Sequence, residues 1–279
     1  MKITYLGTTM LLFDDGKDQI LFDCHISRPS LIKCFLGKFE TDRAVADRVI
    51  RDFAIDRLKG VFISHTHHDH VMDAPYFLAQ CGGDIYGSAS ARNVALGGGV
   101  DESRIHCYED SMEYAVGDYR IRVIPSIHSI AHWYNNDLGQ VINAPLIQPA
   151  PKKAYKEGGS FDFQVEHGKT KYLIRPSYNY LEGQLDNIQA DVLFLGIGGL
   201  SKDTTERKVH FYAETIDKVH PSIVVPVHWD NFFTPLFDES KWCTGALDNP
   251  MNSIQEVKTY CESKGIQFIH QMPLECVEI

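Results

Sequence analysis

The sequence SHTHHDH at residues 64–70 is the most specific pattern in this chain, and it directly follows an apolar run that is typical of a buried strand. It contains the pattern His65-x-His67-x-Asp69-His70, which gathers potential metal ligands at tight spacing. In an extended turn the imidazoles of His65 and His67 point the same way and can share one cation. Asp69 and His70 begin the next helix and can turn toward a neighbouring cation. Because these donors are nitrogen and oxygen atoms without a thiolate, they favour zinc, with manganese, iron or nickel as alternatives.

Strand and helix patterns extend in both directions from this stretch. In chain order, the elements expected before residue 100 are strands at 2–7, 9–13 and 19–23, a helix over 41–54 capped at Thr41, a strand at 61–64, a helix from about His70 to Cys81, a short strand at 84–88, and a helix capped at Ser88 or Ser90. The chain therefore begins with antiparallel strands and continues with helices and strands in alternation.

The rest of the chain is expected to complete a single domain over residues 1–279. The elements predicted there are strands within 103–125, a hairpin over 161–174, a strand at 191–199, a helix over 207–220, a strand at 222–228, a helix over 253–265 and a strand at 266–270. Alternation of this kind is typical of an α/β fold. Residues 129–160 show no sustained period, and because irregular segments this long are usually functional, we interpret them as a lid-like insertion.

Composition limits the classes of function. The chain has 279 residues, and 27 Lys plus Arg against 37 Asp plus Glu give a net charge of −10. This charge, without a long Lys/Arg run, argues against nucleic acid as a partner. No apolar stretch is long enough for a membrane span, which predicts a soluble protein. The seven cysteines are scattered and form no CxxC pair, so a reducing cytoplasm is the expected compartment.

Two further histidines stand where an apolar strand that contains a proline ends. They are His128 in RVIPSIHS and His228 in VVPVHWD, and each is presented at a sheet edge by a rigid element. Arg28 and Arg175 also come just past strands, and a guanidinium at this edge could bind a carboxylate or phosphate of a substrate.

Together, LGTT near the start of the chain, ILFD at 20–23, SHTHHDH, PSIHS and VVPVHWD resemble the metallo-β-lactamase superfamily, and the likeness spans nearly the whole chain. Within it the sequence looks most similar to a branch of metal-dependent hydrolases that includes sugar-lactone hydrolases. The resemblance implies an αββα four-layer sandwich, two mixed sheets with helices outside, and a metal site at one edge between the sheets. It also implies which residues hold metal: His65, His67 and His128 the first ion, and Asp69, His70 and His228 the second.

The resemblance also bears on residues around the metals. Asp23 matches a family acid that would support the histidine loop, because a ligating imidazole needs an acceptor for its other nitrogen, and Asp230 could act similarly beside His228. The family usually supplies a bridging Asp where this sequence has Pro176 and Ser177. A neutral hydroxyl brings no negative charge to offset two dications. Occupancy by one or by two metal ions therefore stays open.

The function expected from this resemblance is metal-dependent hydrolysis of a small-molecule ester, lactone or phosphoester. Metals would lower the pKa of a bound water, the resulting hydroxide would attack the substrate, and Asp69 would orient the water and move its proton. An apolar organic substrate fits the aromatic residues expected at the rim, which are Trp133, Tyr134, Tyr178, Tyr180, Trp229, Phe232, Phe233 and Trp242.

Two other classes of function remain as alternatives. A noncatalytic metal-binding or ligand-sensing protein on the same fold is motivated by Ser177, which stands where a bridging acid is expected. Nucleic-acid processing, as in the superfamily's tRNA-processing ribonucleases, is disfavoured by the net charge of −10. A homo-oligomer that shares the lid or the aromatic rim is compatible with this interpretation. His25 and His132 are left without an assigned role.

Overall fold

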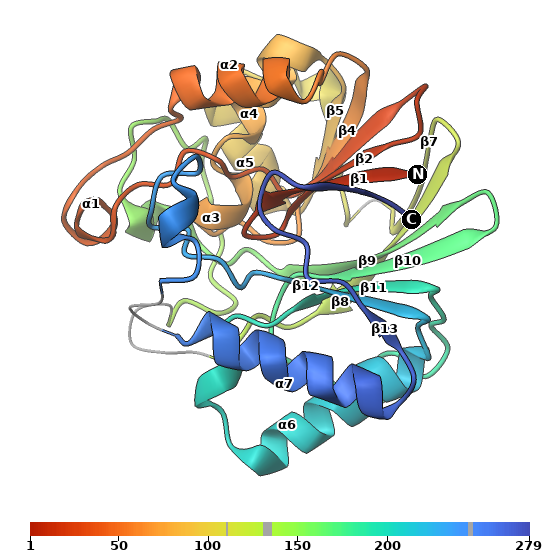
Figure 1. The fold of residues 1–279 in the computed structure, drawn as a ribbon. Coiled ribbons are helices and arrows are strands. Elements are labelled where there is room, and N and C mark those ends of the chain that lie inside the picture. The colour runs from red at the N-terminus through yellow and green to blue at the C-terminus, as the bar shows by residue number, and fades with distance from the viewer. Residues whose placement is uncertain (110, 131–135, 245–247) are drawn as a thin grey trace.

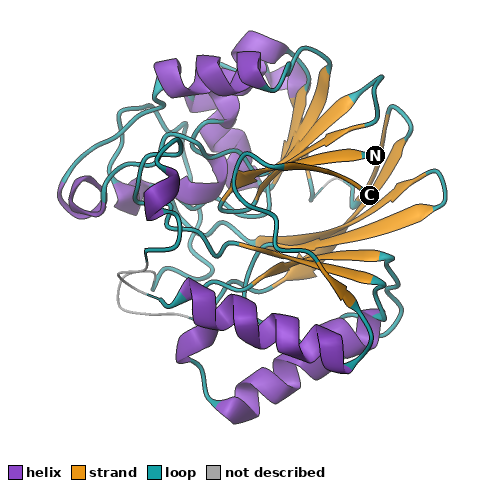
Figure 2. Cartoon of the chain, viewed as in Figure 1, coloured by secondary structure: helices purple, strands orange, loops and turns teal. Residues whose placement is uncertain are grey.

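Two mixed β-sheets lie face to face, with helices on both outer sides, in the computed structural model (Figure 1, Figure 2). The model describes residues 1–109, 111–130, 136–244 and 248–279. The helices α2, α4 and α5 cover one sheet, and α6 and α7 cover the other (Figure 1). This is the αββα four-layer arrangement that the sequence predicts. Within the described residues, no helix is both long and apolar enough to cross a membrane.

The first sheet comes from the amino-terminal part of the chain and from its last strand. In spatial order its strands are β14 (Cys276–Glu278), β1 (Lys2–Gly7), β2 (Met10–Asp14), β3 (Gln19–Phe22), β4 (Leu58–Phe62), β5 (Asp84–Gly87) and β6 (Ile105–Cys107). The pairs from β14 to β3 are antiparallel, and the pairs from β3 to β6 are parallel.

The second sheet repeats this pattern. In spatial order its strands are β7 (Glu113–Val116), β8 (Tyr119–Ser126), β9 (Ser160–His167), β10 (Thr170–Arg175), β11 (Val192–Gly196), β12 (Ile223–Val227) and β13 (Gln267–Phe268). The pairs from β7 to β10 are antiparallel, and the pairs from β10 to β13 are parallel. Both sheets therefore follow the same plan, with antiparallel strand pairs at one side and parallel strand pairs at the other.

The helices begin and end close to the expected positions. They are α1 (Leu31–Leu36), α2 (Arg43–Asp52), α3 (His68–Val71), α4 (Ala74–Cys81), α5 (Ala89–Gly97), α6 (Thr205–Tyr212) and α7 (Pro250–Ser263), with a π-helical turn at Ala213–Asp217 and 3₁₀ turns at Glu102–Arg104, Lys152–Ala154, Leu200–Lys202 and Glu239–Lys241. The expected Thr41 cap is wrong, because the Asp42 side chain accepts the hydrogen bond from Val45 N. The single helix expected from His70 is also wrong, because the chain forms α3 and α4 in succession.

Burial of the strands explains why the sheets pack together. Between the sheets, the rings of Phe13 and Tyr172 meet edge to face at a centroid distance of 5.2 Å, and those of Phe22 and Phe163 pack at a tilt at 5.3 Å. Strands that are buried on both faces show continuous apolar runs, as β11 does with all five residues buried. Such strands are rigid supports, and residues that follow their carboxyl ends are held in fixed positions.

Candidate metal centre

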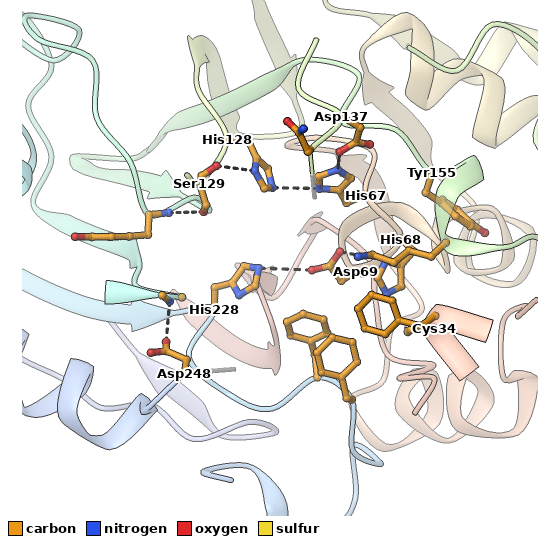
Figure 3. A pocket seen from close by; sticks show the side chains of 18 of the residues that line it. Cys34, His67, His68, Asp69, His128, Ser129, Asp137, Tyr155, His228 and Asp248 are labelled. Carbon is orange, nitrogen blue, oxygen red and sulfur yellow. Dashed lines mark hydrogen bonds and ion pairs between the residues drawn. The ribbon is translucent and has the colours of Figure 1, made fainter. Parts of the chain in front are cut away.

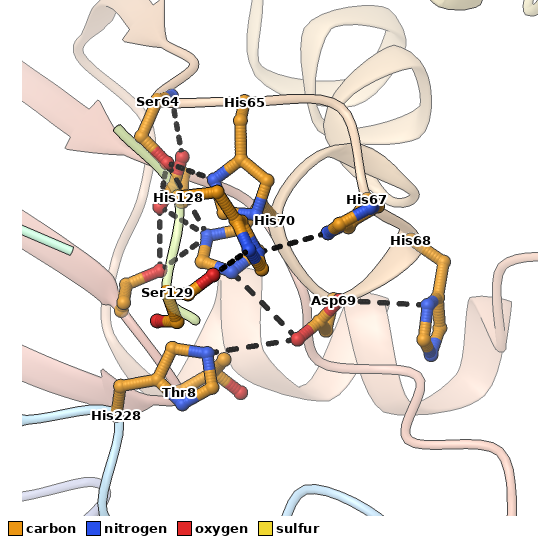
Figure 4. Close-up of polar contacts among 12 residues, drawn as sticks. Thr8, Ser64, His65, His67, His68, Asp69, His70, His128, Ser129 and His228 are labelled. Atoms are coloured by element: carbon orange, nitrogen blue, oxygen red, sulfur yellow. Dashed lines mark hydrogen bonds and ion pairs between the residues drawn. The ribbon is translucent and has the colours of Figure 1, made fainter. Parts of the chain in front are cut away.

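The histidine loop connects the carboxyl end of β4 to α3. His65, His67 and His128 each offer a ligand atom, and these atoms lie within 4.8 Å of one another. All three residues are buried. His128 follows β8 of the other sheet, and its ring lies beside those of His65 and His67 (Figure 4). The structure thus brings together the three residues that the resemblance assigns to one metal ion.

A second group of donors lies beside the first. Asp69, His70 and His228 offer ligand atoms within 4.8 Å of one another, and His228 follows β12. The ring centroids of His65 and His70 are 3.7 Å apart, so the two groups adjoin (Figure 4). The residues assigned to a second metal ion are therefore also gathered, next to the first set.

Several histidines are held through one ring nitrogen, which leaves the other for a cation. Nδ1 of His65 lies 3.1 Å from Ser64 Oγ, and its Nε2 is buried without a partner among the described residues. Nδ1 of His128 lies 3.0 Å from the Ser129 carbonyl oxygen. An orphaned buried nitrogen that faces other donors fits a metal ligand, because an outer hydrogen bond fixes the tautomer and the ring orientation.

Asp23 organises the inner end of the site. Its Oδ2 lies 2.7 Å from Nδ1 of His70, while Ser64 N donates to its Oδ1 at 2.8 Å and Ser64 Oγ to its Oδ2 at 2.8 Å. Thr9 Oγ1 also donates to Asp23 Oδ2 at 2.5 Å. One buried carboxylate therefore fixes both the start of the histidine loop and the His70 imidazole, which is the position that the sequence predicts for Asp23.

Asp137 holds His67 in the same way, and the sequence interpretation missed it. Its Oδ1 lies 3.0 Å from Nε2 of His67, whose Nδ1 is directed to His128 Nε2 at 3.1 Å (Figure 3). Asp137 belongs to the long irregular segment, where no periodic pattern marks it. The sequence feature that could have indicated Asp137 is its position a few residues after His128, within the segment interpreted as a lid.

His228 has a backbone φ of +57°, in the left-handed region that residues other than glycine rarely adopt. Its N–H donates to the Thr8 carbonyl oxygen at 2.5 Å, and Thr8 N donates to Asp230 Oδ1 at 2.8 Å. The expectation that Asp230 contacts a histidine ring is wrong. Asp230 instead fixes the turn between β1 and β2, and that turn fixes the backbone of His228.

The charges of the donors suit a divalent cation. Burial lowers the pKa of His65 well below its ordinary value and that of His128 to about 3, so both imidazoles are neutral at pH 7. Burial alone raises the pKa of Asp69, but the surrounding histidines outweigh it and hold this pKa well below its usual range. Neutral imidazoles and an ionised carboxylate are the forms that bind metal. The residues present therefore fit the metal site that the fold implies.

Comparison with known families agrees with this geometry. Residues 6–128 match the model of the family described as "Metallo-beta-lactamase superfamily", from β1 through the histidine loop to His128. The remaining residues supply the second sheet and its helices, which complete the same sandwich. This matched part of the chain is similar to the metallo-beta-lactamase superfamily, and the fold of the two sheets agrees with it.

Three proteins illustrate what this chain is similar to. Igni18, a metallo hydrolase from Ignicoccus hospitalis, matches over 99% of this chain and 97% of its own, with 17% identity and a TM-score of 0.62. The isothiocyanate hydrolase from Delia radicum gut bacteria matches over 100% and 99%, with 13% identity and a TM-score of 0.61. At these identities the likeness shows the fold. Ribonuclease J from Helicobacter pylori is 26% identical over 132 residues, which cover 45% of this chain and 18% of that protein. The chain thus matches about a fifth of the length of this curated relative.

A cavity of about 1230 Å³ opens beside the two groups of metal-ligand donors (Figure 3). Its lining includes His67, Asp69, His128 and His228. Of the aromatic residues expected at the rim, those that line it are Tyr178, Trp229, Phe232 and Phe233. Tyr180 and Trp242 are not among its lining residues in the described parts of the chain. Trp133, Tyr134 and His132 lie outside the described residues.

The two arginines expected to bind a substrate anion are placed elsewhere. Arg28 is 5% exposed and pairs with Asp230 at 2.5 Å, and Arg175 is 1% exposed and pairs with Asp162 at 2.8 Å. Neither lines the cavity. The prediction of a substrate contact is wrong for both, because each guanidinium is buried in an ion pair within the domain.

Ser177, where the resemblance implies a bridging acid, is buried and belongs to neither group of donors in the described residues. Its neighbours bind the segment that carries His128. Tyr178 N donates to Ser129 Oγ at 3.1 Å, and Asn179 Nδ2 donates to the His128 carbonyl oxygen at 2.7 Å. A carboxylate introduced at residue 177 would therefore enter the immediate surroundings of the metal centre.

Cys34 and His68 form a contact on the same cavity wall that the sequence did not predict. Cys34 Sγ lies 3.6 Å from His68 Nε2, and His68 Nδ1 lies 3.4 Å from Asp69 Oδ1 (Figure 3). Burial lowers the pKa of His68 to about 4 and raises that of Cys34 to about 12. The pair is therefore a neutral imidazole and a neutral thiol rather than an activated nucleophile.

This contact predicts the reactivity of Cys34. At pH 8 a thiol with this pKa is ionised to about one part in ten thousand, so iodoacetamide should leave Cys34 unmodified while it modifies the exposed Cys276. Peptide mass spectrometry over a time course of labelling gives the two rates. Labelling of Cys34 as fast as Cys276 would show that the wall is open to solvent or that the thiolate is stabilised.

Proposed function

We propose that this chain is a zinc-dependent hydrolase of a small-molecule ester, lactone or phosphoester. The observation that carries the proposal is the pair of adjoining donor groups on the wall of a cavity of about 1230 Å³. Imidazole nitrogens and a carboxylate are a donor set that zinc accepts readily. Bound there, divalent metal ions lower the pKa of water and stabilise negative charge on a carbonyl or phosphoryl oxygen.

The residues of the chain supply the remaining parts of the mechanism. Asp69 Oδ2 lies 3.6 Å from Nε2 of His228 and 3.7 Å from Nε2 of His70. Because Asp69 stays ionised, it can accept a hydrogen bond from the attacking water, orient it and take its proton. Phe232 and Phe233, with ring centroids 4.3 Å apart, offer an apolar surface to the organic part of the substrate and limit the access of bulk water.

A noncatalytic metal-binding or ligand-sensing protein is the second candidate, and the observation in its favour is Ser177 where the superfamily has a bridging acid. A role in RNA processing receives some support from the similarity to Ribonuclease J, but the net charge of −10 argues against it. A small molecule is therefore the proposed partner. The free thiols of the seven cysteines fit a reducing cytoplasm as the proposed compartment.

Metal content is the first test of this proposal. Because both donor groups are complete, we expect elemental mass spectrometry of protein purified without added metal to find about two ions per chain, mainly zinc. The same protein should hydrolyse members of a panel of esters, lactones and phosphodiesters, and a chelator should abolish this activity.

The variant Ser177→Asp separates the two candidate functions. A native value of about one ion that rises in Ser177→Asp, together with no turnover of any panel member, would favour the noncatalytic candidate. Salt-dependent binding to RNA with cleavage of it would instead favour RNA processing. Protein without bound metal and without metal-stimulated activity would contradict the proposal.

A further inference from the structure

One wall of the cavity is positively charged, although the protein as a whole is acidic. Lys38, Lys152, Lys153 and Lys156 all line the cavity, and they come from just two segments, 34–38 and 151–156. The net charge of the chain is −10, so its overall composition does not explain why four lysines lie close together here. We call these four residues the lysine wall. A cluster of like charges beside a reaction site raises the local concentration of ligands of opposite charge.

The two segments of the lysine wall are joined to each other. Phe39 and Ala150 exchange both backbone hydrogen bonds at 3.0 Å, which places Lys38 beside the segment that carries the other lysines. The Phe39 ring stacks on Tyr155 at a centroid distance of 6.0 Å. Lys152 Nζ also lies 5.1 Å from the centre of the Phe35 ring. The wall is therefore a packed part of the fold with a defined position.

The lysine wall is also fixed relative to the metal centre. Thr66, which lies between His65 and His67, donates from its N to the Glu157 carbonyl oxygen at 2.9 Å and from its Oγ1 to the Lys156 carbonyl oxygen at 2.5 Å. The backbone that carries Lys156 is thus bound directly to the histidine loop. A ligand that reaches the histidines would lie next to this wall.

Three lysines of the lysine wall form no ion pair with the described acids that line the cavity. The acidic lining residues are engaged elsewhere: Asp69 with the histidines, Asp137 with His67, Asp203 with Arg207, Asp230 with Arg28, and Asp248 with Gly199 N and Ser201. In the described parts of the chain, Lys38, Lys153 and Lys156 take part in no ion pair. Burial alone raises the pKa of Asp137, but His67 and, to a smaller extent, the charge of Lys156 lower it. Since none of the three ammonium groups makes an ion pair with a described residue, they can bind an anionic ligand.

We propose that the lysine wall binds the anionic group of a small amphiphilic substrate, which carries a carboxylate, sulfonate or phosphate on an apolar body. The apolar body would contact Phe35 and Leu36, which line the cavity beside the lysines, and Phe232 and Phe233. This inference rests on the proposed function, because it specifies the substrate class of the same site. A cavity of defined volume in an acidic protein suits a small molecule better than a nucleic acid.

A matched pair of fluorescent probes tests the proposal without requiring turnover. 8-Anilinonaphthalene-1-sulfonate and N-phenyl-1-naphthylamine share the same apolar rings, and only the former carries an anionic group. The test variant is Lys153→Gln/Lys156→Gln. The control is Lys2→Gln/Lys169→Gln, which removes the same charge from exposed positions away from the cavity. Lys169 lies beyond the far end of β9, about 23 Å from Ser160 at the site end.

We expect the test variant to bind the sulfonate probe about tenfold more weakly and the neutral probe as the native protein does, because charge-assisted contacts are lost while apolar contacts remain. The control variant should bind both probes as the native protein does. Equal sulfonate affinity in native and test proteins would overturn the proposal. So would a loss, in the test variant, of binding to a short single-stranded RNA without any loss of sulfonate binding.

The probe-binding measurement can be interpreted whether or not the protein proves to be a hydrolase. A protein that turns over no panel member but loses sulfonate affinity in the test variant would keep the lysine wall and reject the hydrolase. If turnover is found, the p-nitrophenyl esters of glutaric and pentanoic acid give a second measurement, since they differ only in a terminal carboxylate. The test variant should then lower kcat/KM for the glutarate ester about tenfold relative to the pentanoate ester.

Discussion

The variant His65→Ala is expected to lose about one metal ion per chain and to lower hydrolytic kcat/KM by about a thousandfold or more. His65 Nε2 is buried and without a protein partner, and its ring lies beside His70 of the second donor group. Loss of a group that only supports a ligand typically costs about 10- to 100-fold in metal affinity or activity, so loss of the ligand itself should cost more. Elemental mass spectrometry and steady-state kinetics give the two values.

A control variant distinguishes the loss of a metal ligand from a general loss of folded structure. His210→Ala removes an exposed histidine of α6 that does not line the cavity, and it should retain native metal content and activity. The fold of His65→Ala should persist, with a far-ultraviolet circular dichroism spectrum like that of native protein treated with a chelator. Native metal content in His65→Ala would contradict the ligand assignment, even if activity were lost.

Local sequence pattern predicted the alternation of strands and helices, and the resemblance supplied the four-layer fold and the set of donor residues. His128 and His228 each follow an apolar strand, and the structure gathers their ring nitrogens with donors of SHTHHDH. Asp23 was also assigned through the resemblance, and it follows β3 beside β4. Local pattern indicates where a strand ends, but it does not indicate which strands lie next to one another.

The residues that the sequence could not place depend on tertiary contacts. Asp137 reaches His67 from an irregular segment, and the lysine wall forms only because Phe39 pairs with Ala150 across the chain. Arg28 was expected at the site edge because it comes just past a strand, yet it pairs with Asp230, which is 202 residues away in sequence. No periodicity marks an interaction of that separation.

The other arginine pair leads to the largest expected change in stability. Arg175→Met should lower the free energy of unfolding by about 3–5 kcal/mol, because it leaves Asp162 buried as an uncompensated charge. The side chains of Arg175 and Asp162 are only 1% and 2% exposed, and Gln184 is the other side chain that contacts both. Urea unfolding in the presence of a chelator measures the change without a contribution from metal. Arg120→Met, at an exposed position of β8, should change stability by no more than about 0.5 kcal/mol.

The double variant Arg175→Met/Asp162→Leu distinguishes a buried charge from a lost contact. If the unpaired carboxylate is the cause, the double variant should be more stable than Arg175→Met, since apolar side chains can replace a buried ion pair at little cost. Burial raises the pKa of Asp162, and loss of the guanidinium should raise it further. The folded state of Arg175→Met then binds a proton that the unfolded state releases, so its deficit should shrink as the pH falls from 8 to 5. A deficit that is independent of pH and persists in the double variant would assign the effect to packing, and Arg175 would then act by filling space between β9 and β10.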